Sequence, residues 1–124
     1  MTTILLVEDN AMNRDMLTRY LQLEGFEVLI ARHGVEAIEV AEASFPKLII
    51  MDLSLPVLDG LEATKRIKAN QRLQHVPILA LTAHAMMEDR KRALEAGCDE
   101  YETKPVSFPS LLVKLHRLLE TTTT

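Results

Sequence analysis

The chain has 124 residues, of which 48% are hydrophobic and 26% are charged, and this is the size and composition of one globular domain. Eighteen acidic against fourteen basic side chains give a formal net charge of −4, so direct binding to a nucleic-acid backbone has little electrostatic support. The longest apolar runs span four or five residues, far below the roughly 20 that a membrane-spanning helix needs. With Cys98 as its single cysteine the chain forms no internal disulfide, and we expect a cytoplasmic protein that binds neither nucleic acid nor membranes.

The first half of the chain alternates predicted strands with predicted helices. An apolar run at 4–7 predicts a strand, and apolar residues at helical spacing predict a helix over 11–23. Gly25 is a natural helix stop, and 26–31 predicts a second strand with a charge near its start. A second helix over 33–44 follows.

The second half continues the same alternation. Strands are predicted at 47–51, 78–81 and 99–102, and helices at 59–69, 85–96 and 107–119. Asp59 with Glu62 has the spacing of a capping box, and Gly97 predicts the end of the fourth helix. Residues 1–120 therefore form one domain in our interpretation, followed by a frayed tail at 121–124.

Five strands alternating with five helices predict an α/β fold, a doubly wound parallel sheet with helices on both faces. The runs beginning at Ile4, Leu48 and Ile78 are apolar throughout, as expected of central strands, whereas 26–31 and 99–102 contain charges, as edge strands do. The strand order 2-1-3-4-5 satisfies this assignment.

Polar residues follow the apolar runs where the strands end. They are Glu8 and Asp9, then Asp52, then Thr82 and Ala83, and finally Lys104 and Pro105. Ligands of open parallel sheets bind beyond the carboxyl ends of the strands, so we expect these residues to form one site.

Three carboxylates in one site need a neutralising partner, since two unit charges 4 Å apart repel by about 4 kcal/mol at an effective dielectric near 20. Mg²⁺ prefers oxygen ligands, commonly one or two carboxylates completed by water and phosphate. Glu8, Asp9 and Asp52 with Lys104 and Mg²⁺ sum to zero charge, which would admit a phosphoryl group. Asp52 is then the predicted nucleophile, with Lys104, the Thr82 hydroxyl and the Ala83 amide on the phosphoryl oxygens.

At this point the chain resembles a response-regulator receiver domain, from about residue 2 to residue 120. The matching motifs are Val7-Glu8-Asp9-Asn10, Met51-Asp52, Leu55-Pro56-Val57-Leu58-Asp59-Gly60, Leu81-Thr82-Ala83, Gly97-Cys98-Asp99-Glu100-Tyr101 and Lys104-Pro105. Leu55 is a small departure, because the family often has methionine there. The resemblance implies the flavodoxin-like fold of chemotaxis receivers and a single-domain regulator similar to the DivK type.

The resemblance also implies roles for individual residues. Glu8, Asp9, Asp52 and the backbone carbonyl of Ser54 would hold Mg²⁺, and Asp52 would accept phosphate from a histidine kinase or histidine phosphotransfer protein. Thr82 and Tyr101 would form a switch pair, while Lys104 bonds the phosphate and Pro105 follows a cis peptide bond. An effector protein would bind the face formed by the fourth helix, fifth strand and fifth helix.

Other functions remain open from the residues alone. A flavodoxin-like FMN binder needs a loop rich in Ser, Thr and Gly after the first strand, where this chain has acids. An aspartate-nucleophile phosphatase would want an Asp at position 54, where this chain has Ser54. A receiver that only docks would not need the intact set of acids and lysine. We expect a protein that catalyses only its own phosphorylation and slow dephosphorylation.

A domain excised from a hybrid kinase or multidomain regulator is the alternative to a free-standing protein, which the initial Met1 favours. The four histidines lack the spacing of a metal site, and His84 alone falls near the predicted site. We expect Cys98 to be a small packing residue.

Overall fold

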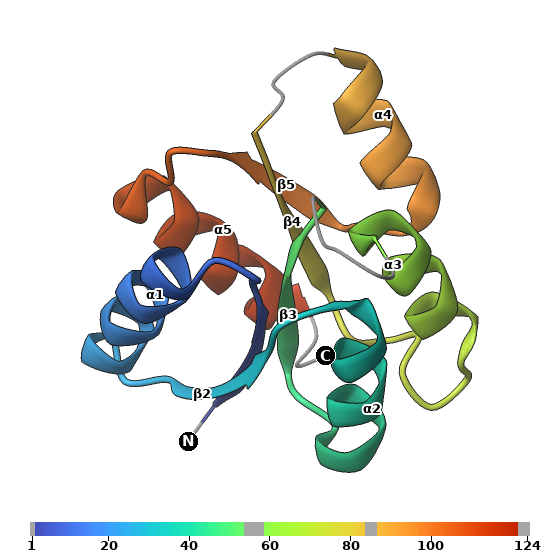
Figure 1. The fold of residues 1–124 in the computed structure, drawn as a ribbon, viewed down its shortest axis with the longest axis horizontal. Helices are drawn as coiled ribbons and strands as arrows, with labels where there is room; N and C mark the ends of the chain where they lie inside the picture. The colour runs from blue at the N-terminus through green and yellow to red at the C-terminus, as the bar shows by residue number, and fades with distance from the viewer. Residues whose placement is uncertain (1, 54–58, 84–86, 122–124) are drawn as a thin grey trace.

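The structure is a computed structural model that describes residues 2–53, 59–83 and 87–121. Five parallel strands form one sheet in the order β2-β1-β3-β4-β5, which confirms the predicted topology (Figure 1). The strands are β1 (Thr3–Val7), β2 (Glu27–Ala31), β3 (Leu48–Asp52), β4 (Ile78–Thr82) and β5 (Glu100–Thr103). The helices are α1 (Ala11–Leu23), α2 (Gly34–Ser44), α3 (Gly60–Ala69), α4 (Met87–Ala96) and α5 (Phe108–Thr121).

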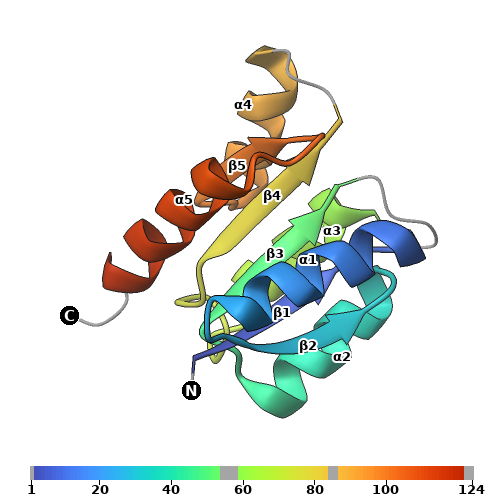
Figure 2. The same ribbon diagram turned by 90° about the vertical axis from the view of Figure 1, so that its left-hand side faces the viewer.

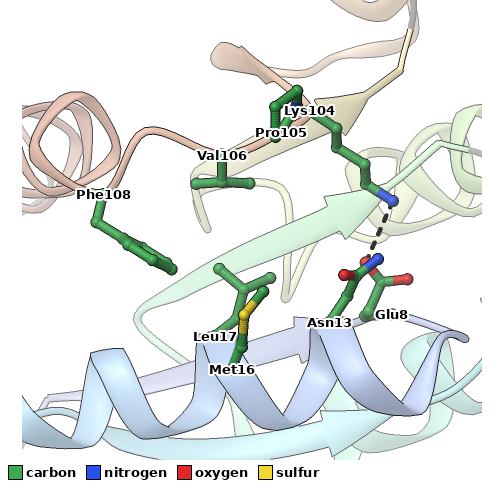
Figure 3. A pocket seen from close by; sticks show the side chains of 8 residues that line it. All are labelled: Glu8, Asn13, Met16, Leu17, Lys104, Pro105, Val106 and Phe108. Carbon is green, nitrogen blue, oxygen red and sulfur yellow. Dashed lines mark ion pairs between the residues drawn. The ribbon is translucent and has the colours of Figure 1, made fainter.

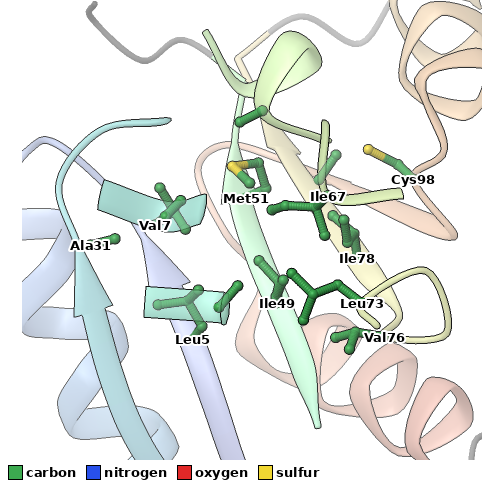
Figure 4. Close-up of a cluster of buried hydrophobic side chains, with 14 of the residues drawn as sticks. Leu5, Val7, Ala31, Ile49, Met51, Ile67, Leu73, Val76, Ile78 and Cys98 are labelled. Carbon is green, nitrogen blue, oxygen red and sulfur yellow. The ribbon is translucent and has the colours of Figure 1, made fainter. Parts of the chain in front are cut away.

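Helices cover both faces of the sheet, α1 and α5 on one face and α2, α3 and α4 on the other (Figure 2). Because successive strand residues point to opposite faces, β1 contributes to two separate cores. Ile4 and Leu6 pack with apolar residues of α1 and α5, whereas Leu5 and Val7 pack with those of α2 and α3 (Figure 4).

The three central strands are buried along almost their whole length. Every residue of β3 and β4 is buried, and so are four of the five in β1, as their continuous apolar sequences predict. In the edge strands, β2 and β5, half-buried and exposed residues predominate, as their charges predict.

Several predicted element limits are shifted by one or two residues. Strand β2 begins at Glu27 because the Phe26 N–H still donates to Leu21 O at the end of α1. Strand β5 begins at Glu100 because the Asp99 carboxylate accepts hydrogen bonds from Ile78 N and Lys68 Nζ. Helix α5 begins at Phe108 and continues to Thr121, one residue into the predicted tail.

The segment between α3 and β4 packs more closely than its polar sequence indicates. Its Leu73 and Val76 side chains are fully buried in the core beneath α2, α3 and α4 (Figure 4). Lys68 of α3 connects this segment to the start of β5. Its ammonium donates to Val76 O at 2.7 Å and pairs at 3.0 Å with Asp99, which directly precedes β5. Sequence periodicity contains no signal for either feature.

Two residues that the predicted site does not use, His33 and Cys98, have structural roles, and the packing role of Cys98 was predicted. His33 caps α2, since its Nδ1 accepts from Glu36 N at 3.2 Å. Cys98 is buried in the core near the Thr64 hydroxyl (Figure 4). Burial raises the pKa of the Cys98 thiol to about 11. Within the described ranges, no helix has the length and apolar character required to cross a membrane.

Candidate functional site

The predicted site residues meet at the carboxyl edge of the sheet because the parallel strands end in register. Asp52 is the last residue of β3 and pairs with Leu81, one residue before Thr82 at the end of β4. Thr82 in turn pairs with Thr103, which precedes Lys104. Glu8 directly follows β1, whose Val7 pairs with Met51. The strand register alone therefore brings these side chains together.

Three acids form the centre of the site. Glu8, Asp9 and Asp52 each place a carboxylate oxygen within 4.8 Å of those of the other two. Glu8 and Asp52 are buried, with 0% and 1% of their surface exposed, whereas Asp9 is exposed. The cluster is therefore open to solvent on the Asp9 side, from which a ligand can reach the two buried carboxylates.

Lys104 is the cation that faces this cluster. Its ammonium donates to Asp52 Oδ2 at 2.8 Å and lies 3.2 Å from Glu8 Oε1 (Figure 3). Partial burial of the ammonium acts to lower the pKa of Lys104, but the hydrogen bond and charge of Asp52 and the charge of Glu8 outweigh burial and raise it. Lys104 therefore stays protonated and offsets part of the negative charge.

Glu8 is the most perturbed acid of the cluster. Burial, followed by the hydrogen bond and negative charge of Asp52, raises the pKa of Glu8 to about 7, against the opposing effects of Asn10 and Lys104. Its Oε2 accepts from Asn10 N at 3.2 Å. Its Oε1 is buried and accepts no hydrogen bond from any residue that the structure describes, although the Lys104 ammonium is near.

This donor set fits a hard divalent cation. A buried carboxylate oxygen without a hydrogen bond, next to two more carboxylates, is a favourable ligand position for Mg²⁺, which takes oxygen ligands. One lysine cannot neutralise three acids, so the cluster retains attraction for a cation. Ser54, the fourth predicted ligand, lies outside the described residues, and so does His84.

Arg14 supports the site, although it was not among the predicted site residues. Its Nη1 donates to Glu8 O at 3.1 Å and to Asp9 O at 3.4 Å, which holds the backbone of both acids from the first turn of α1. Asn10 caps the same helix by accepting from Asn13 N at 2.9 Å. The one indication of this role in the sequence is that a basic residue, Arg14, follows Glu8 by six positions.

The remaining predicted residues lie on β4 and β5 or just after them. The buried Thr82 ends β4, its backbone oxygen accepts from Lys104 N at 2.8 Å, and the exposed Ala83 follows. The Lys104–Pro105 peptide bond is cis, which confirms the implied geometry. Tyr101 is half-buried and pairs with Ala80, so it lies two register positions from Thr82 on the neighbouring strand.

A cavity of about 400 Å³ opens beside the acidic cluster, between α1 and the segment that joins β5 to α5 (Figure 3). Lys104 and Glu8 line one end, and apolar side chains line most of the rest. The lining residues are Glu8, Asn13, Met16, Leu17, Lys104, Pro105, Val106 and Phe108. No pattern in the sequence indicates this cavity, because its walls come from segments about 90 residues apart.

Comparison with known proteins agrees with this geometry. The model of the response regulator receiver domain family matches residues 4–116. Polar-differentiation response regulator DivK of Brucella ovis is 38% identical over 110 residues, which cover 89% of each chain.

Two similar solved structures contain a magnesium ion in one case and a partner protein in the other. The receiver domain of a sensor histidine kinase from Pseudomonas aeruginosa, with a magnesium ion coordinated in its active-site cleft, is 39% identical with a TM-score of 0.90, and the match covers 96% of this chain and 98% of that one. The receiver domain of a Saccharomyces cerevisiae response regulator, solved in complex with a histidine phosphotransfer protein, is 35% identical with a TM-score of 0.88, covering 94% and 88%. The chain belongs to the response regulator receiver domain family and is a domain of two-component signalling.

Proposed function

We propose that the chain accepts a phosphoryl group on Asp52, with Mg²⁺ bound at the acidic cluster, and that phosphorylation changes its affinity for a partner protein. The observation that carries this proposal is the arrangement around Asp52. Its buried carboxylate lies within 4.8 Å of two other acids and receives a 2.8 Å hydrogen bond from Lys104. This combination joins a nucleophile to groups that neutralise phosphate charge.

In the proposed reaction an Asp52 carboxylate oxygen attacks the phosphorus of a phosphohistidine. The bond between phosphorus and the imidazole nitrogen breaks, and its electron pair leaves with the imidazole. Lys104, freed from Asp52 Oδ2, donates to a phosphoryl oxygen, and Thr82 and the Ala83 amide donate to another. Mg²⁺, held by Glu8, Asp9, Asp52 and the Ser54 carbonyl, would supply the remaining charge neutralisation.

The donor is a histidine kinase or a histidine phosphotransfer protein. This part of the proposal is supported by the yeast relative, a receiver domain solved with a histidine phosphotransfer protein. The effector would bind the face formed by α4, β5 and α5, where the large apolar side chains of Met87 and Leu94 are exposed. We place these exchanges in the cytoplasm, with no nucleic acid or membrane bound directly.

The only reactions that the chain promotes in this proposal are those of its own Asp52. Asp52 is consumed as it reacts and is restored only by hydrolysis, so the chain promotes its own phosphorylation and slow dephosphorylation and turns over no other substrate. The same site would serve a free-standing regulator or a receiver within a larger kinase.

The direct test is incubation with acetyl phosphate and Mg²⁺ followed by intact mass measurement. We expect wild type to gain one phosphoryl group, and Asp52→Asn to gain none because the amide is not a nucleophile. Asp59→Asn is the matched control: Asp59 is exposed and caps α3 through Glu62 N, and asparagine caps equally well. Phosphorylation of Asp52→Asn at the wild-type rate, or wild-type phosphorylation in excess EDTA, would contradict the proposal.

A further inference from the structure

The cavity between α1 and the segment that joins β5 to α5 has apolar walls and a charged end. Its volume is about 400 Å³, and Glu8 and Lys104 lie at the charged end (Figure 3). The apolar walls include Met16, Leu17, Val106 and Phe108. A concave, mostly apolar space with a few polar groups that fix orientation is the usual form of a small-molecule site. The cavity therefore suits a ligand with an apolar body and a polar head.

Contacts between the two walls hold the cavity open at a fixed width. The Tyr20 ring of α1 stacks on the Phe108 ring with 4.2 Å between the centroids and 20° between the planes. The Tyr20 hydroxyl also donates to Phe108 O at 3.1 Å. A ligand would therefore enter a preformed space, and its binding would not have to order the walls.

Two side chains offer hydrogen-bond acceptors at the charged end. Glu8 Oε1 is buried and accepts no hydrogen bond within the described part of the chain. The half-buried Asn13 bonds Asn10 through its backbone N–H, whereas its side-chain amide forms no hydrogen bond with any described residue. Figure 3 shows the Asn13 and Glu8 side chains beside each other. A buried acceptor without a donor costs free energy, so a ligand that donates to Glu8 recovers it.

The charges at this end favour a cationic head over an anionic one. Glu8, Asp9 and Asp52 carry three formal negative charges against the single positive charge of Lys104. The Lys104 ammonium already donates to Asp52 Oδ2 at 2.8 Å and lies 3.2 Å from Glu8 Oε1. An anionic head would have to compete with two carboxylates for that ammonium, whereas a cationic head meets an excess of negative charge.

We propose that this cavity binds a small primary amine with an apolar body. The ammonium donates to Glu8 Oε1 and to the Asn13 side-chain oxygen, and the body lies against the apolar walls. The ammonium then occupies the Glu8 oxygen that the proposed function assigns to Mg²⁺, so the amine and Mg²⁺ exclude each other. This last consequence rests on the proposed function, whereas binding of the amine does not.

The test titrates 2-phenylethylamine into the full chain labelled at its methionine methyl groups, without Mg²⁺ and at about pH 8, where an alkylamine is protonated. We expect a saturable shift of the Met16 methyl signal, because Met16 lines the cavity. Met12 is 75% exposed on the same helix and does not line the cavity, so its signal should not move. An unsaturable Met16 shift, or none, would overturn the proposal.

Two matched compounds identify the role of the positive charge. The neutral 2-phenylethanol should bind at least about tenfold more weakly, because a hydrogen bond between two charged groups is stronger than one with a neutral donor. The anionic 3-phenylpropanoate should bind more weakly still. Equal affinities for the three compounds would show that the cavity does not select a cation.

Variants of the charged end test whether Glu8 and Asn13 receive the ammonium. Glu8→Gln should weaken the amine by about tenfold and leave 2-phenylethanol unchanged, and Asn13→Ala should weaken the amine by a smaller factor. Asp15→Asn is the matched control, because Asp15 is an exposed acid of α1 that pairs with Arg19 outside the cavity. An equal loss in Asp15→Asn, or an unchanged affinity in Glu8→Gln, would overturn the assignment of the charged end.

A second pair of variants tests the apolar walls. Val106→Phe places a larger side chain in the cavity and should weaken both the amine and the alcohol by at least about tenfold. Val113→Phe is the control, because Val113 is 57% exposed on α5 and does not line the cavity. Equal binding by Val106→Phe and wild type would place the amine elsewhere on the chain.

Competition with Mg²⁺ tests the mutual exclusion. The apparent dissociation constant of the amine should rise as Mg²⁺ is added, and the amine should slow phosphorylation by acetyl phosphate. If Mg²⁺ leaves the affinity for the amine unchanged in a chain that acetyl phosphate still phosphorylates, the mutual exclusion is wrong. If the chain is not phosphorylated at all, the proposed function fails, while the Glu8→Gln comparison still decides whether the amine site exists.

Discussion

Glu8 combines full burial with a position beside the Asp52 carboxylate, and both disfavour its charged form. Burial and Asp52 raise the pKa of Glu8 from its ordinary 4.5 to about 7. Below pH 4.5 the group is protonated both in the folded and in the unfolded chain and costs nothing. Between pH 4.5 and 7 the folded chain binds the proton more tightly than the unfolded one, so stability falls as the pH rises.

We therefore predict that, without Mg²⁺, the free energy of unfolding decreases from about pH 4.5 to pH 7 by an amount on the order of 3 kcal/mol at most, at 1.36 kcal/mol per pKa unit. Urea unfolding across this range measures it. In Glu8→Gln the contribution should vanish, so the difference between the two profiles isolates Glu8 from the histidines. Parallel profiles of the two chains would contradict the assigned burial effect.

Cys98 illustrates a residue whose chemistry is suppressed by its position. Burial raises the pKa of the thiol to about 11, and the thiolate is the reactive form. We predict that a thiol reagent at pH 7.5 modifies the folded chain far more slowly than the chain in concentrated urea, as followed by absorbance of the released chromophore. Equal rates in the two conditions would show that Cys98 is not buried in solution.

At the scale of elements, the first residue of α3 approaches the backbone of the phosphoacceptor strand very closely. A Cβ added at Gly60 would overlap Asp52 O and would lie 2.7 Å from Leu53 Cα. Both are backbone atoms, which cannot turn aside as a flexible side chain can. Glycine at position 60 is therefore a requirement of the packing between α3 and the end of β3.

We predict that Gly60→Ala lowers stability by about 1 to 3 kcal/mol, as overpacking does, and slows phosphorylation by acetyl phosphate, because the end of β3 carries Asp52. Urea unfolding and the rate of mass gain measure the two effects. Gly25→Ala is the control: Gly25 has φ +92° and open space around it, so alanine there strains the turn without touching the site. A Gly60→Ala chain with normal phosphorylation would show that Asp52 tolerates the displacement.

The sequence predicted the position of an element well where burial requires a run of apolar residues. It predicted the limits of an element less well where side-chain hydrogen bonds set them. Continuous apolar runs identified β3 and β4 as central strands, because burial on both faces requires apolar residues at every position. The start of β5 was placed one residue early, since Asp99 bonds Ile78 N and Lys68 and takes no part in the strand. Such side-chain contacts join distant segments and leave no periodic signal.

The site was predictable for a related reason. In a doubly wound sheet the strand ends share one edge, so reading the residue after each apolar run found Glu8, Asp52 and Lys104. What the sequence could not show is how each group is held. The buried Glu8 oxygen that accepts no hydrogen bond within the described part of the chain, and the support from Arg14, depend on distances that only the folded chain defines.

At the scale of the whole molecule, the lifetime of the phosphorylated state sets how long a signal lasts. A positioned general base speeds hydrolysis by about 10² to 10⁴, and Ser54 cannot act as that base. A phosphatase turning over near 10 s⁻¹ faces a barrier of about 16 kcal/mol, and loss of the base raises it to roughly 19 to 21, or about 10⁻¹ to 10⁻³ s⁻¹.

We therefore predict a phosphorylated chain that lasts from seconds to many minutes. The measurement is the decay of the phosphorylated mass after rapid removal of the donor. Complete loss within about a tenth of a second would reveal a catalytic base that this account lacks, since it exceeds the upper rate by about two orders of magnitude. His84, near the site in sequence, would be the first residue to replace in that case.

In the proposed reaction Asp52, and no other acid of the cluster, carries the phosphoryl group. Reduction of the phosphorylated chain with borohydride converts an acyl phosphate to an alcohol, and peptide mass spectrometry then locates the converted residue. We predict conversion at position 52 alone, dependent on Mg²⁺ and absent in Asp52→Asn. Conversion at Glu8 or Asp9, or a phosphorylated chain with no converted acid, would contradict the account.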